Sequence, residues 1–180
     1  MNTNTDEQIA GSHKVSGQAI RPLKTNFVRM KYLLLVIVSV TVFSGCKKDD
    51  DTDWAVVDDG IIKEYLEENN LTATKHTSGL YYNIKKQGYG GSPNYYSTIE
   101  VVYKGYLTDG SIFDQTSPGL TFKRTLSSLI TGWQIGLPML QRGGSATFYI
   151  PSTLGYGSTE KPNIPKNSVL IFDITLVDFE

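Results

Sequence analysis

From Thr77 onward, apolar and polar residues alternate in short runs that predict β-strands. The runs are "GLYYNIKK", "TIEVVYKGYL", "SIFD", "TFKRTL", "SATFYI" and "SVLIFDITLVDF", and turn-rich segments such as "QGYGGSPNYYS" separate them. Only "SSLITGWQIGLPML" has a helical pattern in this part, and Pro138 predicts a short or kinked helix because it lacks a backbone N–H. The pattern therefore predicts an α+β domain over residues 77–180, with an antiparallel sheet and one helix on its inner face.

A second helical pattern precedes the sheet, in the sequence "DDGIIKEYLEENNL". Its apolar residues fall on one helical face and are Ile61, Ile62, Tyr65 and Leu66. Asp59 is expected to cap the start, and Asn69 with Asn70 to end the helix. We expect residues 59–76 to form a helix and linker that packs on the main domain, with self-association as the alternative.

Residues 30–46 have the three-part pattern of a secretory signal. Lys31 supplies a basic start, a largely apolar run reaches Phe43, and two small residues follow. The apolar run is shorter than the roughly 20 residues of a membrane-spanning helix. The sequence "FSGC" resembles the end of a bacterial lipoprotein signal, which implies that Cys46 is lipidated and becomes the mature N-terminus.

The segments on either side of this signal are polar. Residues 1–29 show no sustained period, and we expect them to be disordered or to precede the true start at Met30. Residues 47–58 belong to a run with two Lys and six Asp, which predicts an acidic, solvated tether. The expected location is the cell envelope, with a lipid anchor in the membrane at Cys46, on the periplasmic face or on the outer surface of the outer membrane.

The composition argues against several kinds of binding site. The 39% of hydrophobic residues suffice for the core of one domain, and a net charge of -1 gives no basic surface for nucleic acid. A single cysteine excludes an intrachain disulfide. Because His13 and His76 lie far apart, the ligands of a structural metal site are lacking, and we expect no metal.

Hydrolytic and nucleophilic chemistry has little support in the sequence. No histidine follows His76, so the domain has none to activate a serine. A glycosidase needs two facing carboxylates, and nothing in the sequence places Asp109 or Asp173 opposite Asp114. The "GYGG" segment precedes no helix and does not predict a phosphate-binding loop.

Aromatic residues on separate predicted elements remain as candidates for a site. Taken singly, each is more often a core residue than a site residue. Tyr156 differs, because it lies in a loop between two glycines, a poor place for a core residue and a good one for a pocket wall. Asp114 directly follows the apolar pair Ile112 and Phe113, which leaves two interpretations: a carboxylate in a surface turn, or a polar group set into a pocket.

The order of four motifs resembles the FKBP-type peptidyl-prolyl cis–trans isomerases. The motifs are "VVYKGYLTDGSIFDQT", "LITGWQIGLPML", "GGSATFYIPSTLGYG" and "NIPKNSVLIFDITLVDF", and the resemblance covers residues 79–180. It implies a twisted antiparallel β-sheet wrapped around one short helix, in agreement with the hydrophobic pattern. It also implies isomerase activity (EC 5.2.1.8) on proline-containing polypeptides, without a cofactor.

By this resemblance, residues of this chain match the positions that form the family's pocket. The residues that match its catalytic positions are Tyr103, Asp114 and Tyr156. Those that match its substrate-binding positions are Phe113, Leu120, Phe122, Leu129, Ile130, Trp133, Ile164 and Phe172. Trp133 is expected to form the floor, while the Ile130 N–H and the Tyr156 hydroxyl are expected to hold substrate carbonyls. Leu120 departs from the family, since many members have an aromatic residue there.

Together these observations predict a lipid-anchored isomerase that assists the folding of exported proteins. The alternative on the same fold is a chaperone or binding module without catalytic activity. A carbohydrate-binding β-module would also use exposed aromatic residues, but it does not explain the ordered motifs. The sequence leaves open the client proteins, the residue preferred before proline and the oligomeric state.

Overall fold

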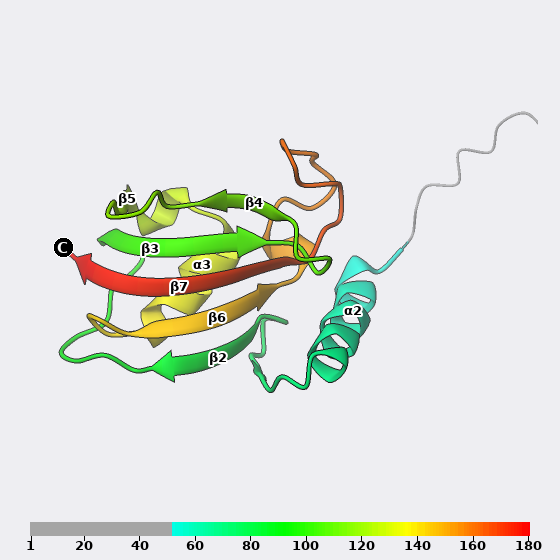
Figure 1. The fold of residues 1–180 in the computed structure, drawn as a ribbon, viewed down its shortest axis with the longest axis horizontal. Helices are drawn as coiled ribbons and strands as arrows, with labels where there is room; N and C mark the ends of the chain where they lie inside the picture. The colour runs from blue at the N-terminus through cyan, green and yellow to red at the C-terminus, as the bar shows by residue number, and fades with distance from the viewer. Residues whose placement is uncertain (1–51) are drawn as a thin grey trace, which may run out of the picture. The chain divides into compact units, whose positions relative to one another are not determined.

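A seven-stranded antiparallel sheet is the frame of residues 52–180, the part of the chain that the computed structural model describes (Figure 1). The strand order is β1-β2-β6-β7-β3-β4, and β5 also pairs with β3. The strands are β1 (Thr74–Lys75), β2 (Tyr81–Lys86), β3 (Thr98–Tyr106), β4 (Ile112–Gln115), β5 (Phe122–Thr125), β6 (Ser145–Ile150) and β7 (Leu170–Phe179). Six of them confirm the strands predicted from the alternating pattern, whereas β1 lies in the predicted linker.

The predicted signal with Cys46, the segment 1–29 and the first part of the tether lie outside the described residues. Within residues 52–180, no helix is both long enough and apolar enough to cross a membrane.

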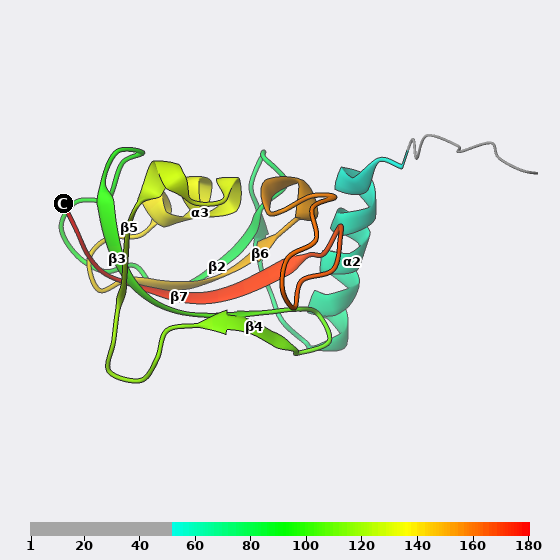
Figure 2. The ribbon, with the colours of Figure 1, turned by 90° about the horizontal axis from the view of Figure 1, so that it is seen from above.

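Successive side chains of the central strand β7 enter two different hydrophobic cores, as expected for a strand covered on both faces. Phe172 and Ile174 pack in the larger core, together with residues of the short helix α3 (Thr131–Gly136). Ile171 packs in a smaller core, together with residues of helix α2 (Trp54–Glu68). Figure 2 shows α3 over one face of the sheet and α2 at one end of it.

Helix α3 is short, as the sequence predicted. At Leu137 it changes into the 3₁₀ turn η3 (Leu137–Met139), which contains Pro138. Glycines bring α3 close to β6: a Cβ atom on Gly132 would lie 2.5 Å from the Ile150 side chain, and one on Gly136 would lie 2.8 Å from the Phe148 ring. Helix α3 therefore rests directly on the sheet. This contact sets the distance between the sheet and the other side chains of the helix.

Helix α2 begins at Trp54, not at the predicted Asp59, so residues 54–58 of the predicted 47–58 tether are helical. The cap is Asp53, whose side-chain oxygen accepts a hydrogen bond from the Ala55 N–H at 3.1 Å. The predicted boundary lies too late because a high density of aspartates also favours a solvated tether. One of those aspartates is the helix cap.

The packing predicted for this helix is confirmed. Ile62 and Leu66 are buried and contact a surface formed by Tyr81 of β2 and Tyr149 of β6. Asn69 is the C-cap, in agreement with the predicted end. Burial of these apolar side chains, and not the charge of the preceding segment, decides where α2 lies.

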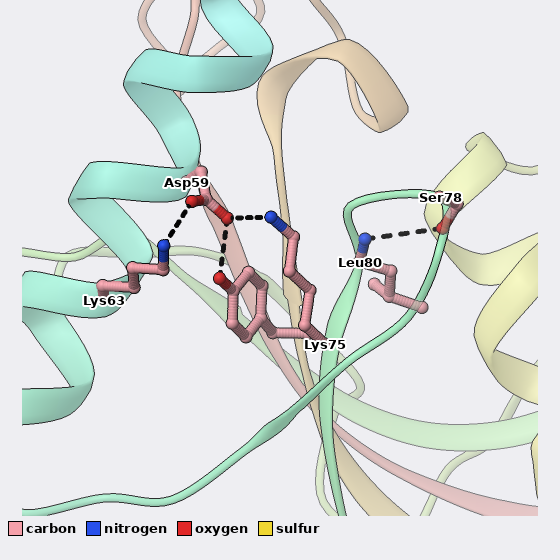
Figure 3. Close-up of polar contacts among 6 residues, drawn as sticks. Asp59, Lys63, Lys75, Ser78 and Leu80 are labelled. Atoms are coloured by element: carbon pink, nitrogen blue, oxygen red, sulfur yellow. Dashed lines mark hydrogen bonds and ion pairs between the residues drawn. The ribbon is translucent and has the colours of Figure 1, made fainter.

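A charged contact reinforces this packing (Figure 3). Asp59 accepts hydrogen bonds from Lys63 of its own helix at 2.7 Å and from Lys75 of β1 at 2.5 Å. Its carboxylate also accepts a hydrogen bond from the Tyr81 hydroxyl at 2.6 Å. The two lysines and the tyrosine hold the pKa of Asp59 well below its usual range. Asp59 thus joins α2 to the first two strands.

Replacing Asp59 by Asn should lower the free energy of unfolding at pH 7 by about 1–2 kcal/mol, because the amide carries no charge to attract the lysines. Since the folded-state pKa of Asp59 is lowered, its contribution is fully present above the pKa of an unfolded aspartate, near ~4, and declines as the pH falls below it. Urea unfolding at pH 7 and pH 3 measures this. The difference between parent and variant should shrink at pH 3, and an equal difference at both pH values would contradict the assignment.

Candidate functional site

A cavity of about 450 Å³ lies between strands β3, β4, β5 and β7, helix α3 and the loop that joins β6 to β7. Ten of the site residues expected from the sequence line it, and Lys161 and Pro162 complete the lining. The full set is Tyr103, Phe113, Asp114, Phe122, Leu129, Ile130, Trp133, Tyr156, Lys161, Pro162, Ile164 and Phe172. Residues that are widely spaced in the sequence thus meet around one cavity.

Edge-to-face aromatic contacts form the bottom of this cavity. Trp133 is only 4% exposed, and its ring centroid lies 5.2 Å from those of Tyr103 and Phe172, with interplanar angles of 82° and 85°. Phe113 contacts Phe172 in the same manner at 5.3 Å. This arrangement is the one favoured by ring quadrupoles, so each ring fixes the orientation of its neighbour.

Phe113 and Asp114 both line the cavity, although neighbouring side chains of a regular strand point to opposite faces. The pairing of β4 with β3 explains this. Asp114 pairs with Gly105 and Ile112 pairs with Tyr106, so Phe113 is an additional residue in a β-bulge. The bulge lets two consecutive residues contribute an apolar wall and a polar group to the same cavity.

Gly105 gives the bulged strand the space it needs. A Cβ atom at this position would lie 2.6 Å from the Phe113 ring and 2.8 Å from the Phe172 ring, both shorter than an ordinary contact. No motif in the sequence indicated a role for this residue. The available signal was a glycine within a predicted strand, which often marks a bulge or a close approach.

Asp114 is held by a second residue of the cavity. Its Oδ2 atom accepts a hydrogen bond from the Tyr103 hydroxyl at 2.5 Å. Burial of the phenol, and next the hydrogen bond to Asp114, raise the pKa of Tyr103 above its usual value. The tyrosine therefore remains a protonated donor at neutral pH, and the carboxylate has a fixed position.

The two carboxylates considered as partners for Asp114 lie elsewhere. Asp109 accepts a hydrogen bond from the Ser111 N–H in the β3–β4 turn at 2.8 Å. Asp173 binds Thr147 at 2.6 Å and Lys85 at 2.9 Å. Neither lines the cavity, so the described residues do not form the facing carboxylate pair of a glycosidase. Within residues 52–180, no cluster of His, Cys, Asp and Glu suits a metal ion.

The segment before α3 contributes main-chain groups. The side-chain amide of Gln134 donates hydrogen bonds to the carbonyls of Leu129 at 2.6 Å and Ser127 at 3.3 Å, which fixes this segment. The Ile130 N–H has no hydrogen-bond partner among residues 52–180. The buried indole Nε1 of Trp133 likewise finds none in the described part of the chain. Both donors lie in residues that line the cavity.

The loop between β6 and β7 supplies the opposite rim. Burial raises the pKa of the Tyr156 hydroxyl, which keeps it protonated. The Lys161 ammonium lies 5.5 Å from the centre of the Tyr156 ring. Lys161 and Ile164 exchange two backbone hydrogen bonds at 3.0 Å, and Asn163 between them has a positive φ of 61°. No motif in the sequence pointed to Lys161 or Pro162 as lining residues.

Leu120 differs from the other expected site residues, because it is 62% exposed and does not line the cavity. It ends a turn in which its N–H donates a hydrogen bond to the carbonyl of Ser117 at 3.0 Å, and Gly119 in this turn has a φ of 78°. The turn places Leu120 in solvent. The position equivalent to the family's aromatic wall therefore contributes no wall here.

Comparison with known proteins agrees with this geometry. Residues 90–177 match the family model described as FKBP-type peptidyl-prolyl cis-trans isomerase. The crystal structure of AtFKBP13 is similar with a TM-score of 0.53 and 31% identity, over 61% of this chain and 99% of that one. The chain belongs to this family. The FKBP fold predicted from the sequence is thereby confirmed.

Two further relatives extend the comparison. A probable FKBP-type isomerase, FkpA of Neisseria meningitidis, is 40% identical over 125 residues, which cover 66% of this chain and 44% of the relative. The crystal structure of FkpA from Escherichia coli has a TM-score of 0.63 and 29% identity, over 87% of this chain and 74% of that one. The chain spans less than half the length of the curated relatives it matches.

Replacing Gly105 by Ala should push the Phe113 and Phe172 rings apart and lower the free energy of unfolding by about 1–3 kcal/mol. Urea unfolding measures the loss, and the ring signals of the two phenylalanines in NMR spectra should shift. The control is Gly60→Ala in helix α2, where a Cβ atom would have no neighbour within 4 Å. That change should be neutral or stabilising, and equal effects of the two changes would contradict the close approach at Gly105.

Proposed function

We propose that the chain catalyses cis–trans isomerisation of X–Pro peptide bonds in this cavity. The observation that carries the proposal is the set of ten family-matched side chains that surround a single aromatic cavity with unpaired hydrogen-bond donors. A buried aromatic floor suits the apolar ring of proline. The main-chain N–H of Ile130 and the hydroxyl of Tyr156 are suited to the carbonyls of an extended peptide.

The chemistry needs no bond cleavage. Rotation about the X–Pro amide crosses a barrier of roughly 18–20 kcal/mol that arises from amide resonance. A catalyst must bind the twisted amide more tightly than either planar isomer. Twisting removes resonance and lowers the charge on the carbonyl oxygen, so the apolar rings favour it by excluding the water that stabilises the planar form.

Seven of the cavity residues take a role in this rotation. The proline ring lies on the Trp133 indole, between the walls formed by Phe113 and Phe172. Ile130 and Tyr156 hold the flanking carbonyls while the bond turns. Asp114, oriented by the Tyr103 hydroxyl, provides a fixed negative charge beside the amide. No proton is transferred to Asp114, since the reaction releases none.

We also propose that the protein is a lipoprotein of the cell envelope and acts on exported polypeptides. The supports are the signal pattern of residues 30–46, the "FSGC" sequence that ends at Cys46, and the short polar segment between Cys46 and helix α2. A tether of this kind lets an anchored domain meet unfolded chains near the membrane.

Replacing Phe113 by Ala or Asp114 by Leu should lower kcat/KM for an X–Pro peptide at least about tenfold, because each change removes part of the surface that holds the twisted amide. A protease-coupled assay on residues 47–180 measures this. The control is Ile112→Ala, a neighbour on β4 that is 48% exposed and does not line the cavity. Retention of full activity by both site variants would contradict the role of the cavity. A folded parent that lacks activity but binds the peptide would show the alternative, a binding module without catalysis.

Replacing Cys46 by Ser should abolish incorporation of a radiolabelled fatty acid when the full chain is expressed in a bacterium that processes lipoproteins, because serine offers no thiol for lipidation. The variant should also leave the detergent phase in a Triton X-114 partition. Mass spectrometry of the parent should find Cys46 at the N-terminus. Persistent labelling of the variant, or peptides from residues 1–29 in the mature protein, would overturn the assignment.

A further inference from the structure

Helix α2 carries a buried carboxylate that neither the fold nor the proposed catalysis has yet explained. We propose that Asp58 positions Tyr156 for contact with substrate, acting through Ser152 in the loop between β6 and β7. This inference rests on the proposed isomerase function, in which Tyr156 holds a peptide carbonyl. Asp58 itself does not line the cavity.

The contact between the helix and the loop is direct and buried. Asp58 is fully buried and Ser152 is 1% exposed. One carboxylate oxygen, Oδ2, accepts hydrogen bonds from both the N–H and the hydroxyl of Ser152, each at 2.7 Å. These bonds fix the start of the 3₁₀ turn η4 (Ser152–Leu154), whose first N–H groups have no partner within the turn.

Ser152 in turn holds both neighbours of Tyr156. Its carbonyl accepts hydrogen bonds from the Gly155 N–H at 2.9 Å and from the Gly157 N–H at 2.8 Å. The Gly157 carbonyl then accepts a hydrogen bond from the Asn167 N–H at 2.8 Å, which closes the base of the loop. A residue whose two flanking amides are tied to one atom has little freedom to move its own backbone. The position of Tyr156 thus depends on Ser152.

The free-energy cost of burying the Asp58 carboxylate indicates that this residue does more than attach the helix. Its second oxygen, Oδ1, is buried without a hydrogen-bond partner among residues 52–180, and burial raises the pKa of the carboxyl. An incompletely paired buried carboxylate is destabilising compared with an apolar residue of similar size. Attachment of α2 is already served by Ile62, Leu66 and the neighbouring Asp59.

The two adjacent aspartates therefore join helix α2 to different parts of the fold. Asp59 joins α2 to strands β1 and β2, as Figure 3 shows for Lys75. Asp58 joins the same helix to the loop that carries Tyr156. Helix α2 precedes residues 90–177, which match the family model. Asp58 therefore contacts this loop from a helix that lies outside the residues matched by the family model.

Replacing Asp58 by Ala in the full chain should lower kcat/KM for an X–Pro peptide about tenfold, because Tyr156 is no longer held where the carbonyl needs it. Ser152→Ala removes only the hydroxyl bond and should cause a smaller loss in the same direction. Asp59→Asn is the matched control: it should lower the thermal midpoint but leave kcat/KM unchanged at a temperature where all variants are folded. Equal kcat/KM values for the parent, Asp58→Ala and Ser152→Ala would overturn the proposal.

Two further readouts separate positioning from general stability. In a Tyr156→Phe background, Asp58→Ala should cause little additional loss of kcat/KM, because both changes remove the same contact, whereas additive losses would contradict a route through Tyr156. In NMR spectra, the ring signals of Tyr156 should shift in Asp58→Ala and Ser152→Ala but not in Asp59→Asn. The spectra do not require activity. An inactive parent would therefore refute the proposed isomerase, while unshifted Tyr156 signals would by themselves refute the positioning.

Discussion

Both the core and the cavity depend on the contacts made by the buried indole ring of Trp133. Helix α3 can carry this ring to the sheet only because Gly132 and Gly136 let the helix lie against β6. The ring then meets Tyr103 of β3 and Phe172 of β7 edge to face, so the residues that close the hydrophobic core also form the floor of the cavity. The contacts that stabilise the core therefore also shape the lining of the cavity.

Two polar residues of the cavity, Asp114 and Tyr156, are held in position by hydrogen bonds from elsewhere in the fold. The bulge opposite Gly105 turns Asp114 into the cavity, where the Tyr103 hydroxyl fixes it. On the opposite rim, hydrogen bonds to Ser152 restrain the backbone around Tyr156. A reaction that only rotates an amide needs this kind of site, because its catalysis comes from fixed surroundings that fit the twisted state and not from proton transfer.

Much of the fold could be predicted from the sequence, because alternation of apolar residues and the effect of Pro138 are local properties. The start of α2 could not be predicted in this way. An aspartate such as Asp53 suits both a tether and a helix cap, and only the packing of the helix decides between them. Ten residues that the motifs indicated line one cavity, whereas Leu120 lies in an exposed turn that the motifs did not predict. Gly105 and the contact between Asp58 and Ser152 depend on pairing across the fold, which no local pattern reports.

The central claim is that an X–Pro peptide bond rotates between cis and trans while the proline ring lies on the Trp133 indole. NMR exchange spectroscopy of an X–Pro peptide, recorded together with the indole Nε1–H signal of Trp133, tests it most directly, because this buried donor has no partner within residues 52–180. The account predicts that the indole signal shifts as peptide is added, and that exchange between the cis and trans peptide signals accelerates in proportion to the protein present. Unchanged exchange in the presence of the folded protein would contradict it.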